Sequence, residues 1–111
     1  MNPDSFKYLE DILNSIEIIK SHLTGTKIFS EYTSNFMLID AVERRLAIIG
    51  EALWKLTKLD NDIKITDQKK IIALRHILVH DYDLIDDASI WKIVNNNLET
   101  LKEELQKYLN N

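Results

Sequence analysis

Apolar residues recur at alternating steps of three and four between about residues 34 and 59. This spacing places them along one side of an α-helix. A second apolar row lies beside the first, so the helix has more apolar surface than one neighbouring helix covers. We therefore expect a helix that is central to a bundle, or that faces a second subunit as well as its own core. The first row is Ile39, Val42, Leu46, Ile49, Leu53 and Leu56, and the second is Leu38, Ala41, Ile48, Ala52 and Leu59.

Two further segments carry the same periodicity, one near each end of the chain. The first helix is predicted over residues 4–23, capped by Asp4 or Ser5 and stopped by Gly25 in a left-handed conformation. The last helix is predicted to begin at a cap formed by Asp86 or Asp87. Their apolar positions are Phe6, Leu9, Leu13, Ile16, Ile19 and Leu23 in the first helix, and Trp91, Val94, Leu98, Leu101, Leu105 and Tyr108 in the last.

A third helix is predicted from a cap at Thr66 or Asp67 to near His80, between a polar joint over 60–65 and an acidic loop over 81–87. The chain of 111 residues has only two glycines and one proline, which favours long helices with short joints. Gly50 lies inside the central helix, where we expect close approach of another helix. The predicted fold is an all-α, antiparallel four-helix bundle in a single domain over 1–111, with room for one extra short helix in 27–33.

The composition limits the classes of function. The chain has no cysteine, which excludes disulfides, zinc knuckles and thiol nucleophiles and fits a reducing cytoplasm. No signal-peptide pattern follows the first residues and no apolar run is long enough for a membrane span, so we expect a cytoplasmic protein. The net charge of −4 has the wrong sign for holding nucleic acid by the overall field. Any such function needs a local basic patch, for which the best candidates are Arg44, Arg45, Lys55 and Lys58.

Residues that can act on a phosphodiester gather where the third helix is predicted to end. Arg75 offers a fixed, forked cation, His76 and His80 titrate near neutrality, and Tyr82 offers a phenol. Cleavage of RNA by transesterification needs a base, an acid and positive charge on the phosphorane, which these residue types supply without a metal. On an ideal helix His76 and His80 lie about 40° apart, whereas Arg75 and His80 lie about 140° apart. Spacing alone therefore does not place all of these groups in one cleft.

The same stretch resembles a known family. Arg75, four intervening residues, His80, one residue and Tyr82 match the R-x4-H-x-Y motif of HEPN-domain toxins. The chain is most similar to the HepT-like toxins, partners of MNT-type minimal nucleotidyltransferase antitoxins, with His76 where asparagine is common. Arg44 matches a basic position of that family, and Arg45 departs from an asparagine. The similarity extends to residues 40–42, 48–52 and 91–94.

The resemblance implies a HEPN-like bundle that forms a homodimer, with both copies of Arg75 and His80 lining one cleft. It implies a toxin with metal-independent endoribonuclease activity on RNA, in which His76 assists and no cofactor is needed. It also implies an antitoxin partner that silences the toxin by attaching AMP to Tyr82.

Simpler interpretations of these residues stay open. Arg75 is also placed to pair with Asp81, Asp83 or Glu51, and Tyr82 to be a half-buried aromatic residue. His76 and His80 have the spacing of a metal pair, although the metalloprotease pattern is absent. A second functional hypothesis is a non-catalytic helical subunit that docks a minimal nucleotidyltransferase or a nucleotide; the acidic charge favours it.

Overall fold

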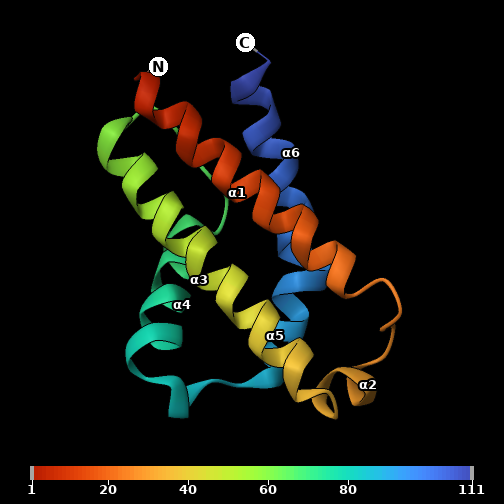
Figure 1. Cartoon of the computed structure of the whole chain (residues 1–111). Helices are drawn as coiled ribbons and strands as arrows, with labels where there is room; N and C mark the ends of the chain where they lie inside the picture. The colour runs from red at the N-terminus through yellow and green to blue at the C-terminus, as the bar shows by residue number, and fades with distance from the viewer. Residues whose placement is uncertain (1, 111) are drawn as a thin grey trace.

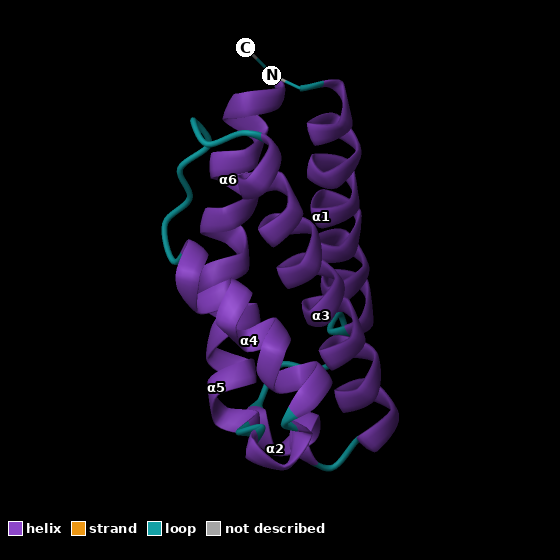
Figure 2. Ribbon diagram, turned by 90° about the vertical axis from the view of Figure 1, so that its left-hand side faces the viewer, coloured by secondary structure: helices purple, strands orange, loops and turns teal. Residues whose placement is uncertain are grey.

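A computed structural model describes residues 2–110, and all regular structure in that range is helical (Figure 2). The chain runs up and down the bundle, and its two ends lie at the same end of it (Figure 1). The predicted all-α antiparallel bundle is confirmed, and α2 is the extra short helix. The predicted single domain over 1–111 stays a prediction, and Met1 and Asn111 lie outside the described residues. The elements are α1 (Pro3–His22), α2 (Phe29–Thr33), α3 (Phe36–Leu59), α4 (Gln68–His80), a 3₁₀ turn η1 (Tyr82–Leu84), α5 (Asp87–Lys92), a π-helical turn η2 (Ile93–Asn97) and α6 (Leu98–Leu109).

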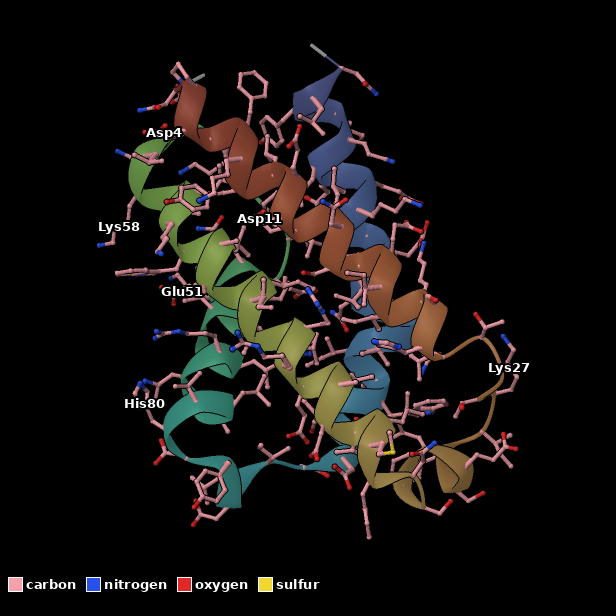
Figure 3. All side chains as sticks on the ribbon, in the orientation of Figure 1. Asp4, Asp11, Lys27, Glu51, Lys58 and His80 are labelled. Atoms are coloured by element: carbon pink, nitrogen blue, oxygen red, sulfur yellow. The ribbon has the colours of Figure 1, made fainter. Side chains whose placement is uncertain are left out.

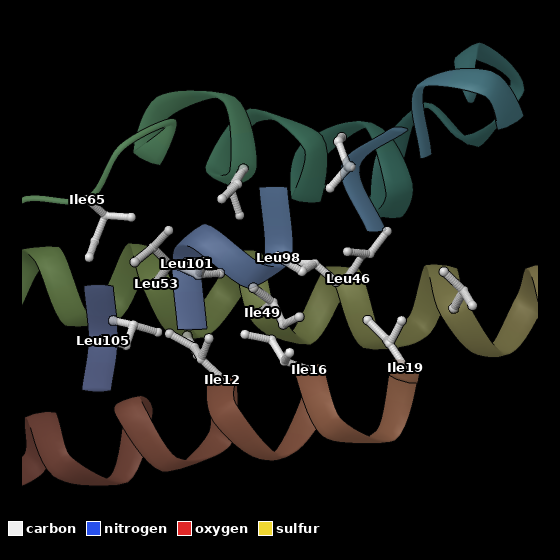
Figure 4. Packing of buried hydrophobic residues seen from close by; sticks show 14 of the residues in the cluster. Ile12, Ile16, Ile19, Leu46, Ile49, Leu53, Ile65, Leu98, Leu101 and Leu105 are labelled. Carbon is white, nitrogen blue, oxygen red and sulfur yellow. The ribbon is translucent and has the colours of Figure 1, made fainter. Parts of the chain in front are cut away.

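The core lies between α1, α3 and α6. In Figure 4 three isoleucines of α1 face the leucines and isoleucine of α3, and three leucines of α6 lie among them. These side chains are aliphatic and almost completely buried, so nearly all of their apolar surface contributes to the stability of the fold. The labelled residues are Ile12, Ile16 and Ile19, then Leu46, Ile49 and Leu53, then Leu98, Leu101 and Leu105.

Helix α3 is central to the bundle, as its two apolar rows predict. Helices α1, α2 and α4 all pack against it. The first row is buried from Val42 to Leu56, and Leu38 and Ala52 of the second row are buried as well. Two predicted core positions at helix ends are wrong, because Leu59 on α3 and Phe6 on α1 are exposed.

The caps of α1 and α3 show how the chain starts its helices. Asn2, rather than Asp4 or Ser5, caps α1: its side chain accepts a hydrogen bond of 2.9 Å from the backbone N–H of Asp4. Pro3 occupies the first turn, where its missing N–H costs nothing. The prediction of a left-handed Gly25 is also wrong, because no glycine has a positive φ in the described chain. Asn35 caps α3, and its side chain accepts a hydrogen bond from the N–H of Leu38.

Of the predicted caps of α4 and α5, only the one of α5 makes a capping hydrogen bond. Asp67 stands before α4 with φ 62°, but its side chain makes no capping bond. The Asp67 carboxylate instead accepts a 2.7 Å hydrogen bond from the side chain of Asn97. Asp86 caps α5 as predicted, accepting from the N–H of Ala88 and from the hydroxyl of Ser89.

The last predicted helix is interrupted by the π-helical turn. Its buried positions are Ile90, Ile93, Leu98, Leu101 and Leu105, which are separated by steps of three, five, three and four. A step of five turns the helix too far for α-helical geometry, and a single π turn restores the apolar face. The predicted row through Trp91 and Val94 is therefore shifted by one residue, and both of those side chains are only partly buried.

Candidate active site at the end of α4

Hydrogen bonds connect the loop before α4 to α6 and fix where α4 begins. The Tyr108 hydroxyl accepts a 2.9 Å hydrogen bond from the N–H of Lys64 and donates to the same residue's carbonyl at 3.3 Å. The N–H of Thr66 donates to both carboxylate oxygens of Glu104, at 3.2 and 3.1 Å. These bonds hold the joint between α3 and α4 against the last helix.

Gly50 sets how closely α4 lies on α3. A Cβ at this position would collide with the Cβ of Arg75 and would stand 3.1 Å from the carbonyl oxygen of Ile71. Glycine inside a helix costs about 1 kcal/mol against alanine, and the close contact of the two helices offsets that cost. The predicted close approach at Gly50 is confirmed, and the residue that fills the space is Arg75.

Arg75 is paired with an acid on α3. Its Nε lies 2.7 Å from Oε2 of Glu51, and the two side chains are 32% and 34% exposed. Oε2 is buried and accepts no hydrogen bond among the described residues, so this contact is an ion pair rather than a well-directed hydrogen bond. Of the partners that the sequence offered to Arg75, the structure selects Glu51.

The two imidazoles lie together on the exposed side of α4. Their ring centroids are 4.9 Å apart with the planes tilted by 47°. Nε2 of His76 lies 3.6 Å from Oδ2 of Asp81, a contact that becomes an ion pair when the imidazole is protonated. His80 is the last residue of α4, and in Figure 3 it extends from the outer edge of the bundle. Both side chains are exposed and open to a ligand.

Tyr82 lies just beyond, in the 3₁₀ turn after α4. Its side chain is 74% exposed, so the alternative of a half-buried aromatic residue is wrong. The neighbouring Leu84 is also exposed, and no residue of this turn is buried. The phenol is therefore accessible to a modifying enzyme.

A hollow of about 370 Å³ lies between α1, α3 and α4, beside Arg75. Arg75 and Val79 form its α4 wall, but His76, His80 and Tyr82 do not line it. The reason is helical geometry: His76 and His80 occupy the row next to that of Arg75 and Val79, turned by about 100° around the axis. Within one protomer the structure pairs the imidazoles and pairs Arg75 with Glu51, but does not collect all four site residues in one hollow. The other lining residues are Lys7, Tyr8, Asp11, Arg44, Ala47, Ile48, Glu51, Ala52 and Lys55.

Between residues 2 and 110 no group of three or more histidine and acidic side chains is arranged to hold a metal ion. In the same range no helix has the length and apolar character needed to cross a membrane.

The chain is similar in sequence to several known proteins. Residues 12–108 match the family described as ribonuclease HepT-like. The chain belongs to the HepT-like ribonuclease family. It is 34% identical over 103 residues to a candidate RNase of Methanocaldococcus jannaschii, covering 89% of this chain and 91% of that protein. It is 32% identical over 104 residues to a probable ribonuclease HepT of Thermococcus cleftensis, covering 90% and 91%.

A longer relative carries the same similarity. A Methanocaldococcus jannaschii protein named as a gamma-glutamylcyclotransferase and candidate RNase is 34% identical over 110 residues, which cover 98% of this HepT-like chain. The chain spans 49% of that protein's length. No solved structure gives a significant match. The resemblance to HepT-like proteins that the motif predicted is therefore confirmed at the level of the family.

Some residues that line the hollow beside the HepT-like motif could not be recognised as site residues from the sequence. Lys7 and Tyr8 lie far from Arg75 along the chain and reach the hollow only because α1 packs on α3. On α3 the signal is present: Arg44, Glu51 and Lys55 follow helical spacing and face one side. It indicates a polar face without saying that the face borders the site.

Proposed function

We propose that this HepT-like chain is a metal-independent endoribonuclease that cuts RNA by transesterification. One observation carries the proposal: in a chain of this family, Arg75 and two exposed imidazoles lie within the last two turns of α4. A base takes the proton of the ribose 2′-hydroxyl, and the 2′-oxygen bonds to phosphorus. The bond to the 5′-oxygen breaks, and an acid protonates that leaving oxygen. The products are a 2′,3′-cyclic phosphate and a 5′-hydroxyl.

Each site residue has a role in this scheme. Arg75 stabilises the negative phosphorane through its terminal amino groups while Glu51 holds Nε. His80 exchanges protons with the reacting oxygens, and His76 assists it. Since Arg75 and the imidazoles face different sides of α4, a second copy would supply the missing group to each cleft. Leu84, an apolar side chain exposed beside the site, would be covered in such a homodimer.

The experiment is an RNA cleavage assay in EDTA. Arg75→Ala and His80→Ala are each expected to lower the rate by about 100-fold or more, the usual contribution of a proton-transfer or phosphate-binding group. His22→Ala is the matched control, because it removes the third histidine of the chain from the exposed end of α1. Cleavage at the wild-type rate by both site variants, or no cleavage by wild type, contradicts the nuclease.

The homodimer is tested separately by light scattering of the purified chain at micromolar concentration. A mass of two chains is expected. A monomer at that concentration argues against a shared cleft while leaving the rest of the scheme to the cleavage assay.

The proposal extends to the role of toxin in a toxin–antitoxin pair. Tyr82 is an exposed phenol beside the site, which suits it as the acceptor of AMP from a minimal nucleotidyltransferase antitoxin. Its modification adds bulk and negative charge where the RNA phosphate would bind, so cleavage stops. Mass spectrometry after incubation with such an enzyme and ATP should place AMP on Tyr82, and Tyr82→Phe should stay unmodified. AMP found only on other tyrosines would contradict this part.

A second candidate function is a non-catalytic subunit that docks the nucleotidyltransferase or a nucleotide. The net charge of −4 and the engagement of Arg75 by Glu51 favour it. Cleavage by the isolated chain separates the two functions, because only the first requires it.

A further inference from the structure

The hollow beside Arg75 is basic in a chain that is acidic. Its lining has four cations, Lys7, Arg44, Lys55 and Arg75, against two carboxylates. The chain as a whole has 14 basic and 18 acidic residues, so everything outside this hollow has ten basic and sixteen acidic ones. This hollow therefore provides the local positive charge that binding of an anionic strand requires.

Aromatic rings stand next to ammonium groups in and beside this hollow. The amines of Lys7 and Lys55 lie 5.7 and 5.9 Å from the ring centroid of Tyr8, which lines the hollow. On α3 the amine of Lys58 lies 5.5 Å from the centroid of Trp54, whose side chain is 42% exposed. Aromatic rings with cations close beside them are the combination with which proteins bind single strands: the base takes the face of the ring and its phosphate contacts the neighbouring cation.

The two ring–ammonium pairs lead to the proposed catalytic groups. Trp54 is one turn from Glu51 along α3, and Lys58 follows one turn later. Figure 3 shows Lys58, Glu51 and His80 in succession along the same side of the molecule, from the end of α3 to the end of α4. Glu51 contacts Arg75, so this side of the bundle connects the rings to the site.

We propose that this surface, defined by Lys7, Tyr8, Trp54, Lys55 and Lys58, binds single-stranded RNA on one side of the scissile phosphate. Bases stack on Tyr8 and Trp54, and phosphates contact the three lysines. The carboxylate of Asp11, which also lines the hollow, accepts hydrogen bonds from base N–H groups, which duplex RNA keeps within its base pairs. The inference rests on the proposed function, since it assigns the RNA path that leads to Arg75.

Binding is measured separately from cleavage by using the full chain carrying His80→Ala, which keeps the RNA intact. The probe is a fluorescein-labelled, mixed-sequence single-stranded RNA of about 16 nucleotides, followed by anisotropy. Adding Lys55→Ala and Lys58→Ala should weaken binding and lower the slope of log affinity against log salt by about 0.7 for each lost contact. The matched control removes the same charge from the start of α4, by Lys69→Ala and Lys70→Ala, and should leave the slope unchanged.

Trp54 gives a second and independent readout. Trp91 is partly buried against Tyr32, with ring centroids 5.3 Å apart, so Trp91→Phe keeps an aromatic ring there and leaves Trp54 as the single tryptophan. Its emission should be quenched as the RNA is added. In the original background Trp54→Ala should weaken binding about fivefold or more, the usual loss of one stacked base. Because Trp54 is exposed, this change should leave the fold intact.

The outcomes separate this proposal from the nuclease. Cleavage by wild type, together with equal affinity of the two lysine double variants and constant Trp54 emission, overturns the RNA path and keeps the nuclease. Loss of binding in the Lys55 and Lys58 variant with no cleavage by wild type keeps the path and removes the nuclease. No binding of the probe, or a Trp54 emission that responds only to protein concentration, overturns the path; the second result would assign Trp54 to contact between copies.

Discussion

The contact between α1 and α3 differs from the last turns of α4 in how far its residues are buried. This difference separates the part that stabilises the fold from the part that carries the candidate site. Helix α1 has six buried residues and α3 has eight, whereas α4 buries only Ile71 among its thirteen. Among the larger helices α4 packs chiefly on α3, and six of its thirteen residues are exposed. Stability therefore resides in α1, α3 and α6, and the groups suited to chemistry lie on a helix that the core does not fully enclose.

This difference in burial follows from the kinds of residue that α3 and α4 place where they face their neighbours. Core positions of α3 hold large aliphatic side chains, whereas the place on α4 that lies against Gly50 is taken by Arg75. A charged side chain cannot be sealed in a core without a partner, so α4 stays partly open to water there. The openness that weakens the packing of α4 is also what gives a ligand access.

The largest expected effect on stability comes from the core. Leu53→Ala, at a completely buried position, should lower the free energy of unfolding by about 2–5 kcal/mol through lost burial and the cavity left behind. Val79→Ala on α4 is the matched control: its side chain is 48% exposed, and we expect a loss of about 1 kcal/mol or less. Urea unfolding followed by circular dichroism measures both. Equal losses would show that the two regions do not differ as the burial indicates.

Gly50→Ala tests the junction between the two regions. The added methyl would collide with Arg75, so we expect overpacking to cost about 1–3 kcal/mol, reduced by about 1 kcal/mol of gained helix propensity. The shift of Arg75 should also slow RNA cleavage more than the change in stability explains. Thermal unfolding and a cleavage assay on the same sample give the two readouts.

Gly25→Ala is the control for this substitution. A methyl there meets no atom within 4 Å, and the backbone φ is not positive. The change should be neutral or slightly stabilising through the unfolded chain. If both glycine variants behave alike, the close packing at Gly50 does not position Arg75.

The sequence predicted the elements whose signal is local and periodic. The rows on α1 and α3 follow the helical period, and Asp86 lies in the predicted cap position, which its side chain fills. The π turn was missed because Val94 offers an apolar residue one position after Ile93, so the row reads as an unbroken alternation of three and four.

The residues of the candidate site could be predicted from the sequence, but their arrangement in space could not. The partner of Arg75 depends on how closely α4 lies on α3. Gly50 sets this distance although it lies on another helix, twenty-five positions before Arg75 in the chain. Tyr8 reaches the hollow through the packing of α1, which no spacing near Arg75 encodes. Whether Arg75, His80 and Tyr82 work together stays a prediction that the cleavage assay decides.

Tyr108→Phe tests how the site helix is anchored to the scaffold. It removes one hydroxyl that both accepts from and donates to the backbone of Lys64, ahead of α4. We expect a loss of about 0.5–1.5 kcal/mol, the net value of such hydrogen bonds, with faster hydrogen exchange at the Lys64 amide. Tyr82→Phe removes an exposed hydroxyl and should leave stability unchanged. An equal loss in both variants would mean that the joint does not depend on this bond.

The smallest effect belongs to the ion pairs that join α1 to α6 on the surface. Glu17 lies 3.0 Å from Lys102, and Lys20 lies 2.8 Å from Glu99. The hydrogen bond to Lys102 lowers the pKa of Glu17 below its usual 4.5, and Lys20 lowers that of Glu99 in the same way. Because the folded pKa is depressed, the stabilisation is present above the unfolded value of 4.5 and is lost as the pH falls through the lower folded value. Exposed pairs of this kind contribute little and are screened by salt.

Glu17→Gln should therefore lower the unfolding midpoint slightly at pH 7 and not at pH 3, with the difference shrinking at high salt. Glu10→Gln removes a charge from another exposed position of α1 and serves as the control. If both variants show the same pH dependence, the effect comes from total charge and not from the contact with α6. If only Glu17→Gln shows it, the ion pairs belong to the α1, α3 and α6 scaffold.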